Sequence, residues 1–299
     1  MSEEQFSLNK YISASGFCSR READKLIEQA RVTINNKLAL PGAKITPGDV
    51  IEVDGEPIKP KTKPIYIAFN KPVGVTSTTD VKDKSNIIYF INYPKRIFPV
   101  GRLDKDSDGL IFLTNDGDIV NKILRASNNH EKEYIVTVDK QITPDFIRQM
   151  GEGVPVLGTT TSPCYVRQDG GRRFRIILKQ GLNRQIRRMC EYLDYEVREL
   201  TRIRIMNVQL GNLPIGKWRY FTSEEIDKMN ELVADSSKVH HVTSPKAKVT
   251  GKKREVPAEK PKENRNKPAT DRKNNPTPST DKKNKKKSTY AEFRSKRGR

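Results

Sequence analysis

Three aspartates occupy alternate positions in the segment GRLDKDSDGLIFLTNDGD, residues 101–118. Asp104, Asp106 and Asp108 are followed directly by a glycine, which is how an EF-hand calcium loop begins. Counted from Asp104, however, position 12 is Asn115, where such a loop requires a bidentate glutamate. The preceding run NYPKRIFPVGRL also lacks the pattern of the incoming helix. We therefore expect no metal site here.

A second chemistry needs only one carboxylate, and Asp104 has the flanks for it. Arg102 lies two residues before it, and the run GLIFLTNDG behind it is typical of a buried strand that ends in a tight Asp-Gly turn. Such a frame would hold one carboxylate rigidly at the end of a sheet. Asp106 and Asp108 we interpret as a solvated acidic turn. From the residues alone, a catalytic and a structural role for Asp104 both stay open.

The segments that must position Asp104 read mainly as strands. Alternating or apolar strand patterns occupy residues 65–71, 133–140, 174–180, 200–210 and 218–222. Helical patterns occupy residues 118–127, 143–150, 183–193 and 222–233. Because the helices intervene irregularly, we predict an α+β domain over residues 64–236, with a mixed and mainly antiparallel sheet.

The N-terminal part predicts a separate small α+β domain, residues 7–60. Ser19 and Glu22 have the spacing of a capping box at the start of a second short helix. That helix start is basic, with Arg20, Arg21 and Lys25 on or beside it. By spacing alone, such a basic start is more often a solvated face than a surface for nucleic acid. The run EPIKPKTKP then reads as a linker.

Most of the positive charge lies at the C-terminal end. The chain has a formal net charge of +20, and residues 238–299 contain 21 Lys/Arg and 6 Asp/Glu, which contribute +15. This tail contains no Leu, Ile or Trp, so it cannot bury enough apolar surface to offset the entropy of ordering. We predict a disordered polybasic tail, residues 237–299, that serves a polyanion such as RNA, DNA or an acidic membrane.

Other function classes are disfavoured by what the sequence contains. Cys18, Cys164 and Cys190 are scattered without a CxxC pair, which argues against a disulfide framework and a zinc site. No window approaches 18 apolar residues, and the first residues lack an apolar signal core. We therefore expect a cytoplasmic protein with no segment that spans or crosses a membrane.

The whole pattern resembles a known enzyme family. Residues 7–55 resemble the S4 RNA-binding domain, through SRREADKLI, then V-x-[IV]-N and PGD-x-[IV]-x-[VL]. GRLDKDSDGLIFLTNDG resembles the signature motif of the RsuA branch of the pseudouridine synthases, G-R-L-D-x-x-[ST]-x-G-L followed by an apolar run and T-N-[DH]-G. NKPVGVTST, HEKEYIVTV and GLNRQIRRMCEYLDYEV resemble the other family motifs in the right order, and their wording is most similar to the RluF subgroup, which modifies large-subunit ribosomal RNA.

This resemblance implies an isomerisation of uridine to pseudouridine in RNA, without a cofactor. Asp104 matches the family's aspartate, which either attacks the sugar or acts as a base; the sequence leaves both open. Arg187 matches the arginine that pairs with it, and Tyr134 the tyrosine of the K-x-Y motif, expected to stack under the uracil. By its strand alternation alone, Tyr134 would be a core-facing residue.

The resemblance also implies contacts to the RNA outside the catalytic centre. Arg102 is expected to hold the target base out of its stack, and Ile186 to pack against that base. We assign Arg184 and Arg188 to the RNA backbone, Lys71 to a phosphate, and Arg20, Arg21 and Lys25 to RNA held by the S4-like domain. The expected partner of this monomer is large-subunit ribosomal RNA. A transfer RNA stem-loop stays open as a second substrate. The alternative is a non-catalytic, ribosome-associated RNA-binding protein.

Overall fold

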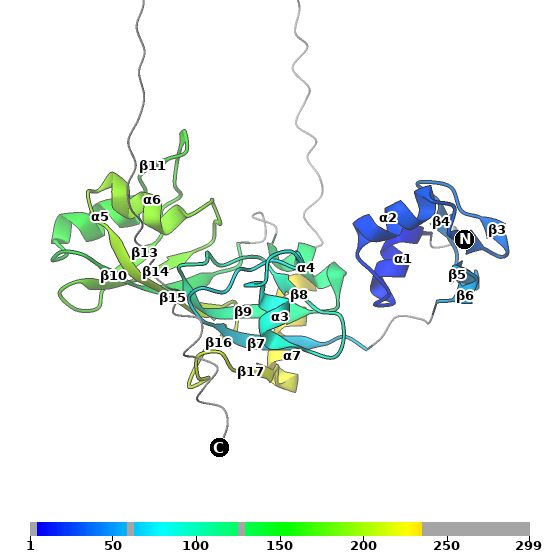
Figure 1. Ribbon diagram of the computed structural model, residues 1–299. Coiled ribbons are helices and arrows are strands. Elements are labelled where there is room, and N and C mark those ends of the chain that lie inside the picture. The colour runs from blue at the N-terminus through cyan, green and yellow to red at the C-terminus, as the bar shows by residue number, and fades with distance from the viewer. Residues whose placement is uncertain (1–4, 59–62, 125–128, 235–299) are drawn as a thin grey trace, which may run out of the picture. The chain divides into compact units, whose positions relative to one another are not determined.

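The computed structural model describes residues 5–58, 63–124 and 129–234 (Figure 1). The predicted polybasic tail lies outside these residues, so its predicted disorder stays a prediction. The described part contains two modules, an N-terminal one and a larger second one. In the described residues, no helix is both long enough and apolar enough to cross a lipid bilayer.

The N-terminal module folds as two helices against short strands. Its elements are β1 (Phe6–Ser7), α1 (Leu8–Ala14), α2 (Arg20–Glu28), β2 (Val32–Ile34), β3 (Lys37–Leu38), β4 (Lys44–Ile45), β5 (Ile51–Val53) and β6 (Glu56–Pro57). The predicted capping box is present, because the Ser19 amide donates to Glu22 Oε2 at 2.7 Å and the Glu22 amide donates to Ser19 Oγ at 3.2 Å. The predicted linker begins later than expected, since Asp54 and Gly55 turn the chain with positive φ and β6 pairs with β5.

The second module contains the remaining elements. They are β7 (Tyr66–Lys71), α3 (Ile87–Ile91), β8 (Phe98–Val100), β9 (Asp108–Thr114), α4 (Gly117–Leu124), β10 (Lys132–Val138), α5 (Pro144–Glu152), β11 (Pro155–Val156), β12 (Thr159–Thr160), β13 (Tyr165–Gln168), β14 (Arg173–Leu178), α6 (Gln185–Tyr192), β15 (Val197–Ile205), β16 (Val208–Gln209), β17 (Trp218–Tyr220) and α7 (Ser223–Ala234). The helix α3 and the hairpin β11–β12 were not predicted from the sequence.

One long sheet runs through this module. In the described residues it has nine strands in the order β13-β14-β10-β15-β9-β7-β17, with β16 beside β15 and β8 beside β9. The pairing of β15 with β9 is parallel, and the other pairings are antiparallel. The predicted α+β fold with a mixed, mainly antiparallel sheet is therefore confirmed.

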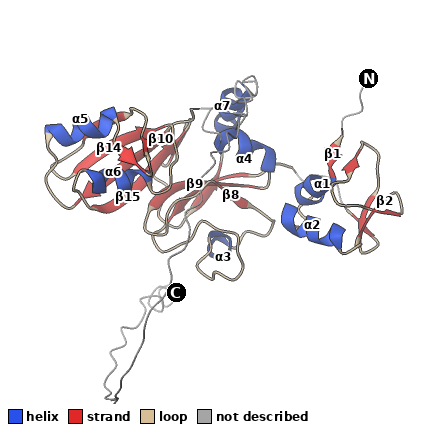
Figure 2. Cartoon of the chain, turned by 90° about the horizontal axis from the view of Figure 1, so that it is seen from above, coloured by secondary structure: helices blue, strands red, loops and turns tan. Residues whose placement is uncertain are grey.

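Three apolar clusters build the core of this module around the sheet. One lies under α5 and α6, a second under α4 and α7, and a third under α3. Figure 2 shows α4 and α7 on one side of β8 and β9 and α3 on the other side. The sheet thus has one half covered by α5 and α6, and another half covered on both faces.

The two halves meet at the parallel pairing of β9 with β15, and a glycine makes this contact possible. Gly109 lies opposite Arg202 in the register and has φ +99°. A Cβ atom at Gly109 would lie 2.3 Å from the Arg202 carbonyl oxygen, so no other residue fits without separating the strands. This close approach brings the loop before β9 next to β15.

Candidate active site

A cleft of about 530 Å³ opens where the loop before β9, the strands β10 and β15, and the start of α6 meet. Asp104 is the acidic residue of its lining. The cationic residues of the lining are Arg102, Lys132, Lys179, Arg184, Arg187 and Arg202. Counted over the described residues, one carboxylate among six cations gives the cleft a strongly positive balance, which suits a polyanion.

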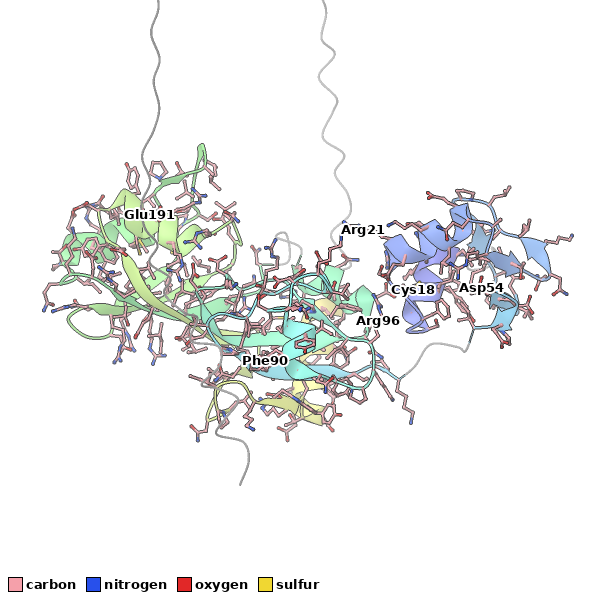
Figure 3. The ribbon with its side chains drawn as sticks, in the orientation of Figure 1. Cys18, Arg21, Asp54, Phe90, Arg96 and Glu191 are labelled. Atoms are coloured by element: carbon pink, nitrogen blue, oxygen red, sulfur yellow. The ribbon has the colours of Figure 1, made fainter. Side chains whose placement is uncertain are left out.

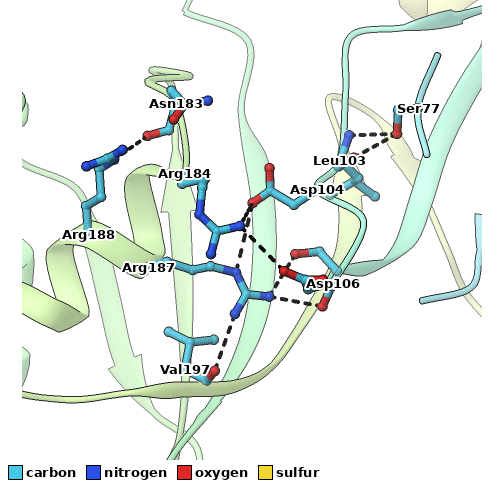
Figure 4. Close-up of polar contacts among 10 residues, drawn as sticks. Ser77, Leu103, Asp104, Asp106, Asn183, Arg184, Arg187, Arg188 and Val197 are labelled. Atoms are coloured by element: carbon cyan, nitrogen blue, oxygen red, sulfur yellow. Dashed lines mark hydrogen bonds and ion pairs between the residues drawn. The ribbon is translucent and has the colours of Figure 1, made fainter. Parts of the chain in front are cut away.

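Asp104 lies in the loop between β8 and β9, and hydrogen bonds fix the backbone on both sides of it. Ser77 Oγ donates to the Leu103 carbonyl at 2.8 Å, and the Leu103 amide is 3.1 Å from the same Oγ (Figure 4). The Ser107 amide donates to the Asp104 carbonyl at 3.1 Å. The Asp104 side chain is 34% exposed, so a rigid backbone presents a reachable carboxylate.

Arg187, on α6, is buried next to Asp104. Its Nη2 donates to the Asp106 carbonyl at 3.0 Å and to Ser107 Oγ at 3.1 Å, while its Nη1 donates to the Val197 carbonyl at 3.3 Å. Its Nε lies 3.9 Å from Asp104 Oδ2 and makes no hydrogen bond (Figure 4). Both Nη atoms are therefore committed to the loop and to β15, while Nε faces the carboxylate.

A second arginine reaches Asp104 from the exposed side. Arg184 Nη1 lies 3.6 Å from Asp104 Oδ2 and 3.6 Å from Asp106 Oδ2. Arg184 precedes the first residue of α6 with φ 49°, a left-handed conformation that is uncommon outside glycine. From the sequence we expected Arg184 to contact the RNA backbone. In this structure its guanidinium lies between the carboxylates of Asp104 and Asp106. Ile186, the next residue but one, is buried and lines the same cleft.

Tyr134 lines the cleft from β10, half-buried between two apolar clusters. The register of β10 with β15 shifts between Glu133 and Tyr134, so Glu133 pairs with Arg204 and Tyr134 with Arg202. This irregularity is a β-bulge, a device that re-aims side chains next to active sites. The face of β10 on which alternation places Tyr134 is therefore a wall of the cleft and not part of a closed core.

The other expected RNA contacts differ in their placement. Arg102 is exposed and lines the cleft. Arg188 does not line it, and its Nε donates to the Asn183 carbonyl at 3.1 Å (Figure 4). In the N-terminal module, Arg20, Arg21 and Lys25 are exposed on α2, and Figure 3 shows the Arg21 side chain.

Lys71 does not fit the phosphate contact predicted for it. Its side chain is fully buried, and its Nζ donates to the carbonyls of Pro72 and Val75, both at 2.9 Å. Burial lowers the pKa of Lys71 to about 8, against the opposing influence of Asp108. The prediction was wrong because Lys71 is the last residue of β7, between β9 and β17, and its side chain is buried where a phosphate cannot reach it.

The interpretation of Asp106 and Asp108 as one solvated turn is also corrected. Asp108 begins β9, and its Oδ1 is buried without a hydrogen-bond partner among the described residues. Asp106 is exposed at 66% of its side chain, but it shares Arg184 with Asp104. Asp106 is solvated and Asp108 only in part, and Asp106 contributes to the electrostatics of the cleft.

Sequence reasoning missed three cations of the cleft: Lys132, Lys179 and Arg202. Arg202 is buried, and its Nε donates to the Leu110 carbonyl at 2.6 Å. Lys132 lies two residues before Tyr134, so strand alternation places both on the same face. The K-x-Y motif that contains Tyr134 also contains Lys132, so the motif and this alternation were the signals that could have identified Lys132. The partners of Arg202 lie about 90 residues away in the chain, and no local pattern reveals them.

The arrangement suits chemistry on an anion-bearing substrate and does not suit a metal. The described residues contain no group of three or more His, Cys, Asp or Glu side chains that could hold a metal ion. Two guanidinium groups already face the Asp104 carboxylate, and they would repel a metal cation. A single carboxylate held beside a buried arginine and a tyrosine can instead attack, or remove a proton from, a nucleotide bound in the cleft.

Comparisons with known proteins agree with this geometry. Residues 65–192 match the family model for RNA pseudouridylate synthase, and residues 7–51 match that for the S4 domain. The chain is 57% identical, over 82% of its length, to the dual-specificity RNA pseudouridine synthase RluF of Escherichia coli O6:H1, and covers 84% of that relative. The chain belongs to the RNA pseudouridine synthases. Within this family it is of the RsuA branch and similar to RluF, as the sequence motifs predicted.

More distant pseudouridine synthases support the same assignment. The ribosomal large subunit pseudouridine synthase B of Bacillus subtilis is 34% identical over 77% of this chain and 98% of that relative. A crystal structure of a pseudouridylate synthase superposes with a TM-score of 0.56 at 28% identity, and the match covers 75% of this chain and 99% of that one. The protein is thus an RNA pseudouridine synthase with an S4 RNA-binding domain, and its substrate is RNA.

Proposed function

We propose that this synthase converts a specific uridine of large-subunit ribosomal RNA to pseudouridine, with Asp104 acting on the flipped nucleotide. The observation that supports this most is the position of Asp104. It is the acidic residue of the cleft lining, and it lies beside the buried Arg187 on a loop fixed by Ser77. The names of the relatives that modify the large ribosomal subunit support the choice of RNA.

The proposed reaction is an isomerisation that needs no oxidant, reductant or energy source. The bond between C1′ of the ribose and N1 of the uracil breaks, the base turns, and a bond forms between C1′ and C5. The proton of C5 leaves, and N1 carries a proton in the product, so atoms and electrons balance. A carboxylate at Asp104 serves either as the nucleophile on the sugar or as the base that gives a glycal.

The neighbouring groups have separate tasks in this proposal. Arg187 provides a fixed positive charge against Asp104 while the entering base excludes water. Tyr134 and Ile186 form the platform and the apolar wall for the uracil. Arg102, exposed at the cleft, supports the nucleotide in its flipped position. When RNA binds, the Arg184 guanidinium leaves Asp104 and binds a phosphate of the RNA.

The decisive test is replacement of Asp104 by asparagine, which keeps the shape of the side chain and removes its charge. We expect Asp104→Asn to bind ribosomal RNA with an affinity near that of the wild type, and to form no detectable pseudouridine. Tritium release from C5-labelled uridine and gel-shift titration measure the two properties. Asp194→Asn is the matched control, because Asp194 is 97% exposed and lies outside the cleft.

The same variant separates the enzyme from its rival, a non-catalytic ribosome-associated binding protein. Normal product formation by Asp104→Asn would contradict the assignment of the carboxylate. An absence of product from the wild type would favour the rival.

The modified site is found by mapping pseudouridine in cells without the gene and in cells complemented with the wild type or Asp104→Asn. The mapping includes transfer RNA, because the names of the RluF relatives contain the term dual-specificity. One position of large-subunit ribosomal RNA should lose its pseudouridine in the deletion and regain it only with the wild type. This substrate also supports our expectation of a cytoplasmic location.

A further inference from the structure

The cleft extends beyond the groups assigned to the target uridine. Its lining draws on two apolar clusters, and we divide the cleft accordingly into two arms. The arm with Asp104, Tyr134 and Arg187 adjoins the cluster under α6, and the second arm adjoins the cluster under α4 and α7. The side chains and the one glycine that line this second arm are Val100, Gly101, Phe112, Ile123, Leu124 and Ile205. We call it the α4 arm.

The floor shared by the two arms follows β10 and β15. Tyr134 pairs with Arg202 at the catalytic end of this floor, and Lys132 pairs with Ile205 at the end that leads into the α4 arm. Two residues along a strand advance by roughly 6 to 7 Å. Lys132 therefore follows Tyr134 at about the distance between neighbouring nucleotides of an extended RNA strand.

Lys132 is a cation without an acidic counterpart. Its Nζ donates to the His130 carbonyl at 3.0 Å, and within the described ranges no carboxylate lies within ion-pair distance of it. Burial and the nearby Arg202 lower the pKa of Lys132, so its charged form is poorly solvated. A half-buried ammonium group in this situation is a ready partner for a phosphate.

The wall of the α4 arm is apolar, and its exposed side chain is Leu124. Leu124, the last described residue of α4, is 43% exposed, whereas the other side chains of this arm are buried. Its Cδ2 would lie 2.9 Å from a Cβ atom at Gly101, so the side chain rests directly on the backbone next to Arg102. An apolar wall beside a cation matches the two parts of a nucleotide, a base with apolar faces and a phosphate.

We propose that the α4 arm is a binding subsite for a second, unpaired nucleotide of the RNA, directly next to the target uridine. Its base packs against Leu124, and its phosphate binds Lys132. This inference rests on the proposed function, because the first arm must hold the uridine. RNA with an unpaired neighbour on one side of the target would then be preferred over RNA in which that neighbour is paired.

The first test uses synthetic stem-loop RNAs that contain one loop uridine, with an abasic residue replacing the nucleotide 5′ or 3′ of it. Binding is measured in the Asp104→Asn background, so that no turnover occurs. We expect the abasic residue on one side, and not on the other, to weaken binding about tenfold, the order measured for the loss of one stacked base. In Leu124→Asp, whose carboxylate blocks the arm, that abasic penalty should fall to less than twofold.

Leu157→Asp is the matched control, because Leu157 is 58% exposed in the hairpin β11–β12, outside the cleft. It should keep the full abasic penalty. An equal abasic penalty in Leu124→Asp and in Leu157→Asp, or no penalty on either side, would overturn the subsite.

The second test addresses the phosphate. Lys132→Met should weaken binding and reduce the slope of log affinity against log salt by about 0.7 to 1, the contribution of one phosphate contact. Lys217→Met, an exposed lysine outside the cleft, is the control. An unchanged slope would remove Lys132 from the subsite. Pseudouridine formation by the wild type on the same RNA tests the proposed function separately, so the two proposals can fail independently.

Discussion

At the scale of single residues, the site combines one buried and one exposed arginine around the same carboxylate. Arg187 is held by three oxygen atoms of the protein and cannot leave Asp104 without breaking those hydrogen bonds. Among the residues that the structure describes, Arg184 pairs with Asp104 and Asp106 alone, and its side chain is 38% exposed. The buried cation therefore belongs to the catalytic group, whereas the exposed one is available to the RNA.

Neutralising Asp106 tests this division. Asp106→Asn removes a carboxylate that competes with RNA for Arg184 and repels phosphates at the cleft, an interaction of about 1 kcal/mol for an exposed pair. We expect the dissociation constant for RNA to fall about fivefold at low salt, with the gain lost at high salt. Fluorescence anisotropy titrations at several salt concentrations measure this dissociation constant. An affinity equal to that of the wild type at every salt concentration would mean that RNA does not use Arg184.

Lys71 makes a prediction about stability and pH. Its pKa falls from 10.5 to about 8 in the folded protein, so the unfolded chain binds more protons between these two values. The Lys71 contribution to the free energy of unfolding should therefore rise with pH through this window, by up to about 3 kcal/mol. Urea unfolding of the wild type and of Lys71→Met at pH 7 to 10.5 measures this contribution as the difference between their free energies of unfolding.

The sign of that difference is what matters. The wild type should gain stability relative to Lys71→Met as the pH rises from 8. Lys95→Met, at an exposed lysine, reports the background of other titrating groups. A difference that stays flat across the window would mean that the Lys71 amine is not desolvated.

At the scale of elements, the contact of β9 with β15 determines whether Asp104 and Tyr134 share a cleft. The parallel pairing involves two residue pairs, Asp108 with Thr201 and Gly109 with Arg202. Arg202 faces Tyr134 on the other side of β15. A displacement of β9 would thus move the aspartate away from the tyrosine, even with both helix-covered halves intact.

The substitution Gly109→Ala should displace β9 from β15. The added Cβ would meet the Arg202 carbonyl at 2.3 Å, and φ +99° is strained for alanine, so we expect a loss of more than about 2 kcal/mol of stability. Gly181→Ala is the control, since a Cβ atom there has no neighbour within 4 Å. Urea unfolding measures both variants. Equal stabilities would show that the strands separate without strain.

The sequence predicted those elements whose cause is local. The capping box at Ser19 and the strand pattern of β9 depend on neighbours within a few residues, and both appear where expected. The burial of Lys71 and the bulge beside Tyr134 depend on strands that come together from distant parts of the chain. Alternation placed Tyr134 on one face of its strand, but it could not distinguish a closed core from the wall of a cleft.

The motifs gave more of the site than periodicity did. Asp104, Arg187 and Tyr134 lie 30 or more residues apart in the chain, and only the family resemblance linked them before the structure did. The roles of Asp106, Lys132 and Arg202 depend on geometry between elements. No short-range pattern of charges carries that information.

At the scale of the whole molecule, charge is divided between the cleft and the tail. Residues 238–299 carry +15 of the net charge of +20. Removing them should weaken RNA binding most at low salt and reduce the slope of log affinity against log salt, because fewer counterions are released. Turnover at saturating RNA in low salt should stay near that of the full chain, since the cleft is unchanged.

Filter-binding titrations at several salt concentrations, together with single-turnover assays, measure the truncated protein. A replacement tail of equal length with Gln in place of Lys and Arg is the matched control for chain length. A large loss of turnover at saturating RNA would show that the tail acts on the catalytic step.

The join between β9 and β15 has a consequence for how this enzyme loses activity. Two pairs of residues align groups that belong to separately packed halves, so slight slippage there would disable turnover long before either apolar core melts. Activity on heating should then vanish below the temperature at which circular dichroism changes. The catalytic assay would therefore detect the thermal change at a lower temperature than circular dichroism does.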